Sequence, residues 1–345
     1  MRPVFDGHND TLLRLWRHDR SGGQFINGGH GHIDLPKAKA GGFVGGLFAT
    51  FVPPGNASVT AANTASDGTV TAPAVGAISQ EEAMRVTMGQ LAVAYRLERM
   101  GAVAICRTMD DIERARAGEK LAMVLHSEGA EAIGPDLDEL EVLYAAGLRS
   151  LGLVWSRPTI FAHGVPFRFP SSPDIGPGLT DLGVALVKAC NELGIMVDVS
   201  HLNEKGFWDV ARVSRAPLVA THSNAHAICP VSRNLTDAQL DAVRDTGGVV
   251  GLNFATFFLR PDGKRTTDTP LSVMIRQLEH LLKKLGPDGV ALGSDFDGAL
   301  VPQDLGNAAG LPRLIDAMEA AGFGSRIIDN ITHKNWLRVL SQTWR

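Results

Sequence analysis

Short apolar runs alternate with longer amphipathic segments along most of the chain. The runs are rich in Val, Ile, Leu and Ala, and several are apolar at nearly every position, which is typical of strands covered on both faces. They lie at Pro3–Asp6, Gly42–Phe51, Leu121–Ser127, Leu148–Trp155, Ile195–Ser200, Leu218–Thr221, Val249–Phe254 and Val290–Ser294. The segments between them have helical periodicity. Predicted helices include Gln80–Arg99, Asp181–Leu193, Glu204–Val213, Thr236–Thr246 and Leu271–Leu285, and Leu311–Leu340 is expected to hold two more packing helices.

Eight strands separated by helices predict an α/β fold, a parallel (β/α)₈ TIM-type barrel. A doubly wound open sheet is the alternative, but the regular rhythm of eight strands favours the closed barrel. The 345 residues, 44% of them hydrophobic, are enough for one large core. We therefore predict a single barrel domain over residues 1–345.

Two segments interrupt this rhythm. Residues 53–78 are rich in Ala, Thr, Gly, Pro and Asn, and residues 156–178 carry five prolines. They follow the second and fourth predicted strands. In a barrel, loops after strands lie at the face where active sites form. We predict two long loops there, at about 53–78 and 156–178.

The charge and cysteine content exclude several classes of function. The formal net charge of −4 offers no broad basic surface, so we expect no nucleic-acid partner. No apolar run is long enough to span a membrane, and no signal segment begins the chain, so we expect no membrane contact and a cytoplasmic location. Three cysteines without a CxxC pair indicate neither a disulfide framework nor a thiolate zinc site.

Imidazole and carboxylate side chains gather where the predicted strands end. His8 and Asp10 are two residues apart, so in extended chain both point to the same side. Glu128 follows the third apolar run, and His201 and His222 follow the fifth and sixth. Each alone could be a solvated carboxylate or a hydrogen-bonded structural histidine. Together they predict a metal site at one barrel rim.

The residue types favour zinc, with manganese, cobalt or iron as alternatives, because all donors are nitrogen or oxygen. Five ligands exceed what one catalytic zinc ion needs. Two zinc ions sharing the carboxylate of Glu128 fit this number better. Such a pair holds a bridging hydroxide and polarises a carbonyl oxygen. Asp295, after the eighth strand, should lie beside the first strand near this site, although it could instead cap a helix.

The chain resembles the renal (membrane) dipeptidase family, whose fold is a metallo-dependent, amidohydrolase-like barrel. The resemblance runs over nearly the whole length and is carried by six motifs in order. They are Asp6-Gly7-His8-Asn9-Asp10, Glu128-Gly129, Asp198-Val199-Ser200-His201, Thr221-His222-Ser223-Asn224-Ala225, Ser232-Arg233-Asn234 and Gly293-Ser294-Asp295-Phe296-Asp297-Gly298.

The resemblance implies a dizinc peptidase that cleaves dipeptides, in some members with a D residue at the C-terminal position. It implies that His8 and Asp10 bind one zinc ion, that His201 and His222 bind the other, and that Glu128 bridges them. Arg233 would bind the substrate carboxylate, as its bidentate guanidinium allows. Asp295 would hold the substrate amine or pass a proton to the leaving nitrogen. The family also implies a homodimer.

One position departs from the family pattern. Where characterised dipeptidases carry a substrate-contacting histidine, this chain has Trp155. The indole N–H can donate one hydrogen bond but cannot replace an imidazolium. His163, in the proline-rich loop, and Arg157 are other candidate substrate contacts.

The sequence therefore predicts a zinc dipeptidase, in which a hydroxide bridging two zinc ions attacks the amide of a small peptide. Trp155 keeps open a binuclear-metal hydrolase of another small amide or ester, such as an N-acyl amino acid, a lactone or a phosphoester. A non-catalytic barrel is a third possibility, which the presence of all five ligand types opposes.

Overall fold

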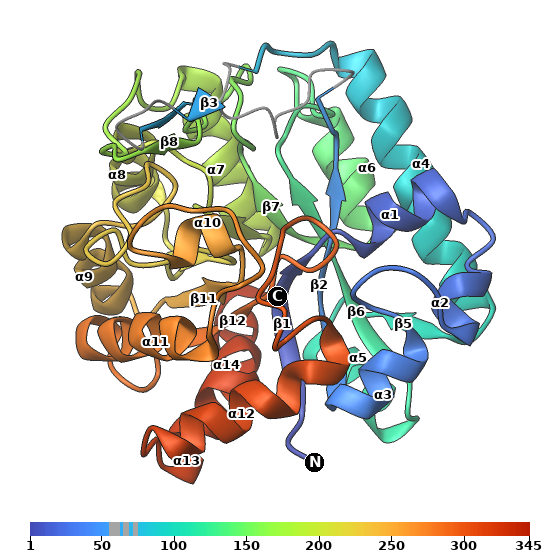
Figure 1. The fold of residues 1–345 in the computed structure, drawn as a ribbon. Coiled ribbons are helices and arrows are strands. Elements are labelled where there is room, and N and C mark those ends of the chain that lie inside the picture. Colours follow the sequence, from blue (N-terminus) through green and yellow to red (C-terminus); the bar gives the residue numbers. More distant parts are fainter. Residues whose placement is uncertain (55–62, 65–68, 72–74) are drawn as a thin grey trace.

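A parallel β-barrel surrounded by helices forms the molecule (Figure 1). The structure, a computed structural model, describes residues 1–54, 63–64, 69–71 and 75–345. Eight strands follow one another in sheet order, each parallel to the next. They are β1 (Val4–Asn9), β2 (Phe43–Phe51), β6 (Leu121–Glu128), β7 (Leu148–Gly152), β9 (Met196–Asp198), β10 (Val219–Ala220), β11 (Val249–Asn253) and β12 (Val290–Gly293). Each predicted run overlaps one of them, so the predicted barrel is confirmed.

Two strand ends differ from the prediction in ways that matter for the site. β1 continues to Asn9, so that His8 lies within the strand. β7 stops at Gly152, three residues before Trp155. Beyond its end the carbonyl of Leu153 accepts a hydrogen bond from the backbone N–H of Ala130 at 3.3 Å.

Isolated backbone hydrogen bonds and side-chain hydrogen bonds close the barrel between β12 and β1. The backbone N–H of Asp10 donates to Phe296 O at 2.8 Å, and that of Asp295 donates to His8 O at 3.0 Å. Below them the carboxylate of Asp6 accepts from the N–H and the hydroxyl of Ser294, at 2.7 and 2.8 Å. Complete burial raises the pKa of Asp6 to about 7. Asp6 thus joins the first and last strands where ladder bonds are few.

The predicted helices form largely where amphipathic periodicity placed them. They are α4 (Gln80–Arg99), α7 (Asp181–Leu193), α8 (Glu204–Val213), α9 (Asp237–Asp245) and α11 (Leu271–Leu285). The side chains of Thr180 and Thr236 cap α7 and α9 by accepting backbone N–H groups. Six further helices were not predicted because they are short or offer few apolar positions. They are α1 (Thr11–His18), α2 (Gly23–Asn27), α3 (Leu35–Gly41), α5 (Met109–Ala117), α6 (Asp138–Ala146) and α10 (Thr256–Leu259).

The C-terminal region is divided more finely than the two helices expected. It holds a 3₁₀ turn at Ala308–Gly310, α12 (Leu311–Ala320), α13 (Ser325–Asp329), a π-helical turn at Asn330–Lys334 and α14 (Asn335–Thr343). Glycines at 322 and 324 separate α12 from α13. In the described residues, no helix combines the length and apolar character that crossing a bilayer requires.

The two predicted long loops meet each other and carry short strands. β3 (Asn63–Thr64), β4 (Val70–Thr71) and β8 (Arg168–Phe169) form a small antiparallel sheet, in which Val70 pairs with Phe169. Residues 55–62, 65–68 and 72–74 of the first predicted loop lie outside the described residues. β5 (Val103–Ile105) also went unpredicted, and it pairs with β6 outside the barrel order.

Candidate metal centre

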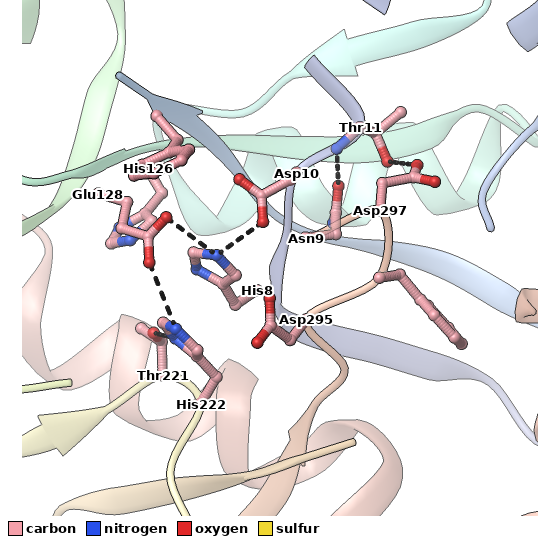
Figure 2. Close-up of polar contacts among 12 residues, drawn as sticks. His8, Asn9, Asp10, Thr11, His126, Glu128, Thr221, His222, Asp295 and Asp297 are labelled. Atoms are coloured by element: carbon pink, nitrogen blue, oxygen red, sulfur yellow. Dashed lines mark hydrogen bonds and ion pairs between the residues drawn. The ribbon is translucent and has the colours of Figure 1, made fainter. Parts of the chain in front are cut away.

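The five predicted ligand residues come together at the carboxyl end of the barrel. His8 belongs to β1 and Asp10 follows it, Glu128 ends β6, and His201 and His222 follow β9 and β10. All five are at most 5% exposed. Figure 2 shows the carboxylate of Glu128 between the rings of His8 and His222. Residues from four separate regions of the sequence thus form one buried cluster.

One group of donor atoms has the spacing of zinc ligands. His201 Nε2 lies 3.0 Å from Glu128 Oε1 and 3.1 Å from His222 Nε2, and His222 Nε2 lies 3.5 Å from the same oxygen. Tetrahedral zinc with bonds of about 2.05 Å places its ligand atoms about 3.3 Å apart. These three atoms could therefore hold one zinc ion.

The other oxygen of Glu128 faces a second group. His8 Nε2 lies 3.7 Å from Glu128 Oε2 and 3.6 Å from Asp10 Oδ2. Donor atoms of His8, Asp10 and Asp295 also lie within 4.8 Å of one another. Asp295, expected to act on the substrate, is therefore close enough to this position to be a ligand as well.

Unpaired polar atoms support a cation at this place. Both ring nitrogens of His8 and Oδ1 of Asp10 are buried and have no hydrogen-bond partner among the described residues. Buried polar atoms are nearly always paired in native proteins. A divalent cation would satisfy the facing nitrogen of His8 and the carboxylate together, so the donor set fits a metal.

The pKa shifts within the cluster also favour a bound cation. Burial, followed by the nearby charge of Asp10, raises the pKa of Glu128 well above its usual value. Burial also raises the pKa of Asp10 to about 7. It lowers the pKa of His8, and the pKa values of His201 and His222 fall well below the usual value. Neutral imidazoles are ready to donate lone pairs, and a cation would stabilise the ionised carboxylates.

Two of the site residues have backbone conformations that are uncommon outside glycine. The φ angles are 67° at His201 and 56° at Asp295. Such left-handed residues persist where surrounding contacts hold them, and they cluster at functional sites. His201 is held through its carbonyl, which accepts from Val165 N at 2.9 Å.

Arg233, the residue predicted to bind the substrate carboxylate, lies against this cluster. It is 3% exposed, and its two Nη atoms donate to Ser223 Oγ at 2.7 Å and to His222 O at 2.8 Å. Burial lowers its pKa to about 10, which still leaves it charged at neutral pH. Asp295 is held by Asn253 Nδ2, which donates to Oδ2 at 2.9 Å.

Trp155, which departs from the family pattern, and the two other candidate substrate contacts have different surroundings. The Trp155 ring is buried, with its centroid 5.1 Å from that of Phe51 and 6.1 Å from that of His201. Arg157 is committed to an ion pair, with Nε 3.1 Å from Glu131 Oε1. The backbone carbonyl of His163 accepts from Asn203 N, at the start of α8, at 3.2 Å.

His126 lies beside the ligands, although no role was predicted for it from the sequence. The ring of His126 meets that of His8 edge-on with centroids 5.4 Å apart, and His126 Nδ1 lies 2.9 Å from Ser150 Oγ. His126 is two residues before Glu128 in one strand, and this spacing was the signal that could have identified it. The carboxylate of Asp297, from the last of the six motifs, accepts from Arg14 Nε of α1 at 3.0 Å.

Known proteins share both the sequence and the fold. A sequence model of a family described as membrane dipeptidase (peptidase family M19) matches residues 1–344. An uncharacterized Klebsiella pneumoniae protein from the pqqA 5′ region is 50% identical over 258 residues, covering 74% of this chain and 95% of that protein.

Two solved structures superimpose over 99% of this chain and 99% of their own. One is a metallo peptidase from Rhodobacter sphaeroides liganded with a phosphinate mimic of the dipeptide L-Ala-D-Ala, with a TM-score of 0.95 and 48% identity. The other is a metallo peptidase described as dipeptidase AC, of family M19, with a TM-score of 0.92 and 49% identity.

Proposed function

From the premise that this chain belongs to the membrane dipeptidase family, peptidase family M19, we propose that it hydrolyses dipeptides with two zinc ions. We further propose that its substrates have an L residue followed by a D residue. The proposal of two ions rests on the two carboxylate oxygens of Glu128, which face different groups. Oε1 faces His201 and His222, and Oε2 faces His8.

The stereochemical proposal rests on similarity. The Rhodobacter structure, 48% identical over nearly the full length, binds a phosphinate mimic of L-Ala-D-Ala. A phosphinate is tetrahedral at phosphorus, as the carbonyl carbon becomes during amide hydrolysis. A related pocket in this chain would accept the same backbone arrangement.

When bound, two zinc ions would supply an activated water and polarise the scissile carbonyl. The residues of this chain then have separate roles. Arg233 binds the terminal carboxylate of the dipeptide, and Asn253 holds Asp295 so that this carboxyl can bind the amine or hand a proton to the leaving nitrogen. Burial of these groups excludes water and strengthens their electrostatic interactions.

Trp155 supports a second candidate substrate. Its ring lies among Phe51, Phe167 and the ring of His201, so an apolar surface stands where the family carries an imidazole. Such a surface suits the acyl group of an N-acyl amino acid. We propose Trp155 as a substrate contact; the proposed contact of His163, the homodimer and the cytoplasmic location stay predictions from the sequence.

A substrate panel with zinc-loaded protein tests the function. L-Ala-D-Ala should be hydrolysed with a higher kcat/KM than L-Ala-L-Ala and N-acetyl-D-Ala. The variant His201→Ala should lose activity by orders of magnitude, since it removes one donor of the zinc group. His30→Ala, at an exposed histidine, is the matched control and should behave as wild type. Full activity of His201→Ala, or preference for the N-acyl substrate, would contradict the proposal.

A further inference from the structure

We propose that Thr221 is a positioning residue that determines the tautomer of His222. Its hydroxyl keeps the imidazole proton on Nδ1 and leaves Nε2 free to bind a metal ion. The inference rests on the proposed metal-binding role of His222. It assigns a function to a residue that touches neither substrate nor metal.

A chain of hydrogen bonds carries the proposal. Thr221 Oγ1 lies 2.5 Å from Asp198 Oδ2 and 2.7 Å from His222 Nδ1. The other carboxylate oxygen of Asp198 accepts the backbone N–H groups of Ser200 and Thr221, each at 2.9 Å. Asp198 is thus surrounded by donors and serves as an acceptor.

The direction of each bond then follows from the number of protons. A hydroxyl has one hydrogen, and that of Thr221 is donated to Asp198. The oxygen consequently presents a lone pair to His222 Nδ1, which must carry the proton to form its 2.7 Å bond. In a neutral imidazole the other nitrogen is then a free acceptor.

The free nitrogen faces the proposed metal position. His222 Nε2 lies 3.5 Å from Glu128 Oε1 and 3.1 Å from His201 Nε2. Figure 2 shows Thr221 next to His222, with the interaction between His222 and Glu128 drawn as a dashed line. Groups that bind the second nitrogen of a metal-ligating histidine commonly orient the ring and raise its affinity for the metal.

The barrel holds Thr221 in a fixed place. Its carbonyl oxygen occupies space that side chains of three glycines on other strands would fill. A Cβ atom would approach this oxygen to 2.4 Å at Gly7, 2.1 Å at Gly251 and 1.9 Å at Gly293. The hydroxyl of Ser156 makes a similar contact with His201 Nδ1 at 2.9 Å, but among the described residues no carboxylate accepts its hydrogen. It can therefore donate to that nitrogen or accept from it, and does not determine the tautomer of His201.

The test compares three variants for zinc affinity, measured by competition with a chromophoric chelator. Thr221→Val keeps the shape but removes the hydroxyl, and Thr221→Ser retains it. Thr332→Val is the matched control, because buried Thr332 also precedes a histidine and lies 3.1 Å from His333 Nδ1. We expect a roughly 10–100-fold loss of affinity in Thr221→Val. We expect wild-type affinity in Thr221→Ser and in Thr332→Val.

Nitrogen-15 NMR of the histidine rings gives a second readout that does not depend on the variants folding. In the wild-type protein His222 should carry its proton on Nδ1. A proton on Nε2, or wild-type zinc affinity in a folded Thr221→Val protein, would overturn the inference. Failure of the wild-type protein to bind zinc would instead overturn the proposed function.

Discussion

At the residue scale, environment assigns different chemistry to histidines with similar sequence surroundings. His126 and His8 are both buried completely, yet His126 bonds to Ser150 Oγ whereas the described residues leave both nitrogens of His8 unpartnered. His222 gains its orientation from Thr221. The carboxylate that Nε2 faces, rather than burial alone, therefore separates these histidines: it is Glu128 for His8 and His222, and Asp198 for His126.

The substitution of Trp155 by histidine belongs to this scale. Restoring the imidazole removes an apolar surface beside His201 and adds a hydrogen-bonding group. We expect Trp155→His to shift the ratio of kcat/KM values toward free-amine dipeptides over N-acyl amino acids by about 10-fold, or about 1.4 kcal/mol. Steady-state kinetics on both substrates would measure the ratio.

The matched control is Trp208→His, at a tryptophan that is 37% exposed on α8. It should leave the ratio unchanged. An unchanged ratio in Trp155→His as well would show that Trp155 does not contact the substrate. Zinc content should be equal in all three proteins, so that a change in selectivity is not a change in metal loading.

At the element scale, helix α14 contributes a buried ring to the core that the barrel strands form. The ring of Trp336 is fully buried among strand side chains, and its Nε1 donates to Leu292 O at 2.8 Å. Gly7 and Gly251 leave room for it, since a Cβ atom at these positions would come within 2.3 and 3.0 Å of the ring. The C-terminal helix thus supports the strands that carry the ligands.

Removing this ring should destabilise the protein strongly. Trp336→Ala leaves a cavity and an unpaired carbonyl, so we expect a loss of about 3–5 kcal/mol in the free energy of unfolding. Denaturant titration followed by circular dichroism would measure it. Trp208→Ala, on the surface, should cost far less. Equal losses in the two variants would show that Trp336 does not support the barrel.

At the scale of the whole molecule, the site concentrates buried charge at one end of a barrel whose last seam is closed by few ladder bonds. Asp6 bridges that seam, and Asp10 and Asp295 flank it. A metal ion would therefore connect the first and last strands as well as serve catalysis. Metal binding and folding should be coupled in this protein.

The coupling predicts a pH dependence of stability. Burial raises the pKa of Asp10 to about 7 and that of Asp295 to about 6, from 3.8. At a pH between 3.8 and the raised pKa of each carboxyl, the folded chain holds more protons than the unfolded chain. The free energy of unfolding of the metal-free protein therefore falls as pH rises from about 4 to about 7. Zinc replaces those protons, so its stabilising effect should grow with pH.

Thermal unfolding with chelator and with zinc, at about pH 5 and about pH 8, would measure this effect. The increase in Tm caused by zinc should be larger at the higher pH. The same increase at both values would show that proton release from these carboxyls is not linked to metal binding. Magnesium, which prefers an octahedral set of oxygen ligands, is the control ion and should have a smaller effect.

The sequence by itself determined the barrel and the set of ligand candidates. Apolar runs of strand length are local patterns, and all eight correspond to strands. The positions of His8, Glu128, His201 and His222 at strand ends were also local information, because parallel strands of a barrel end on one face. The motifs that resemble the membrane dipeptidase family led to the same family that the full-length match establishes.

Only the tertiary structure decided which atoms of these residues face one another. Which oxygen of Glu128 faces which histidine depends on side-chain rotamers and on strand register. The Asp198–Thr221–His222 chain joins β9 to the residues after β10, and no spacing in the sequence reveals its bond directions. The contact of the buried Trp336 ring with the strands and the pairing of the two long loops also join distant segments of the chain. Packing alone selects these contacts.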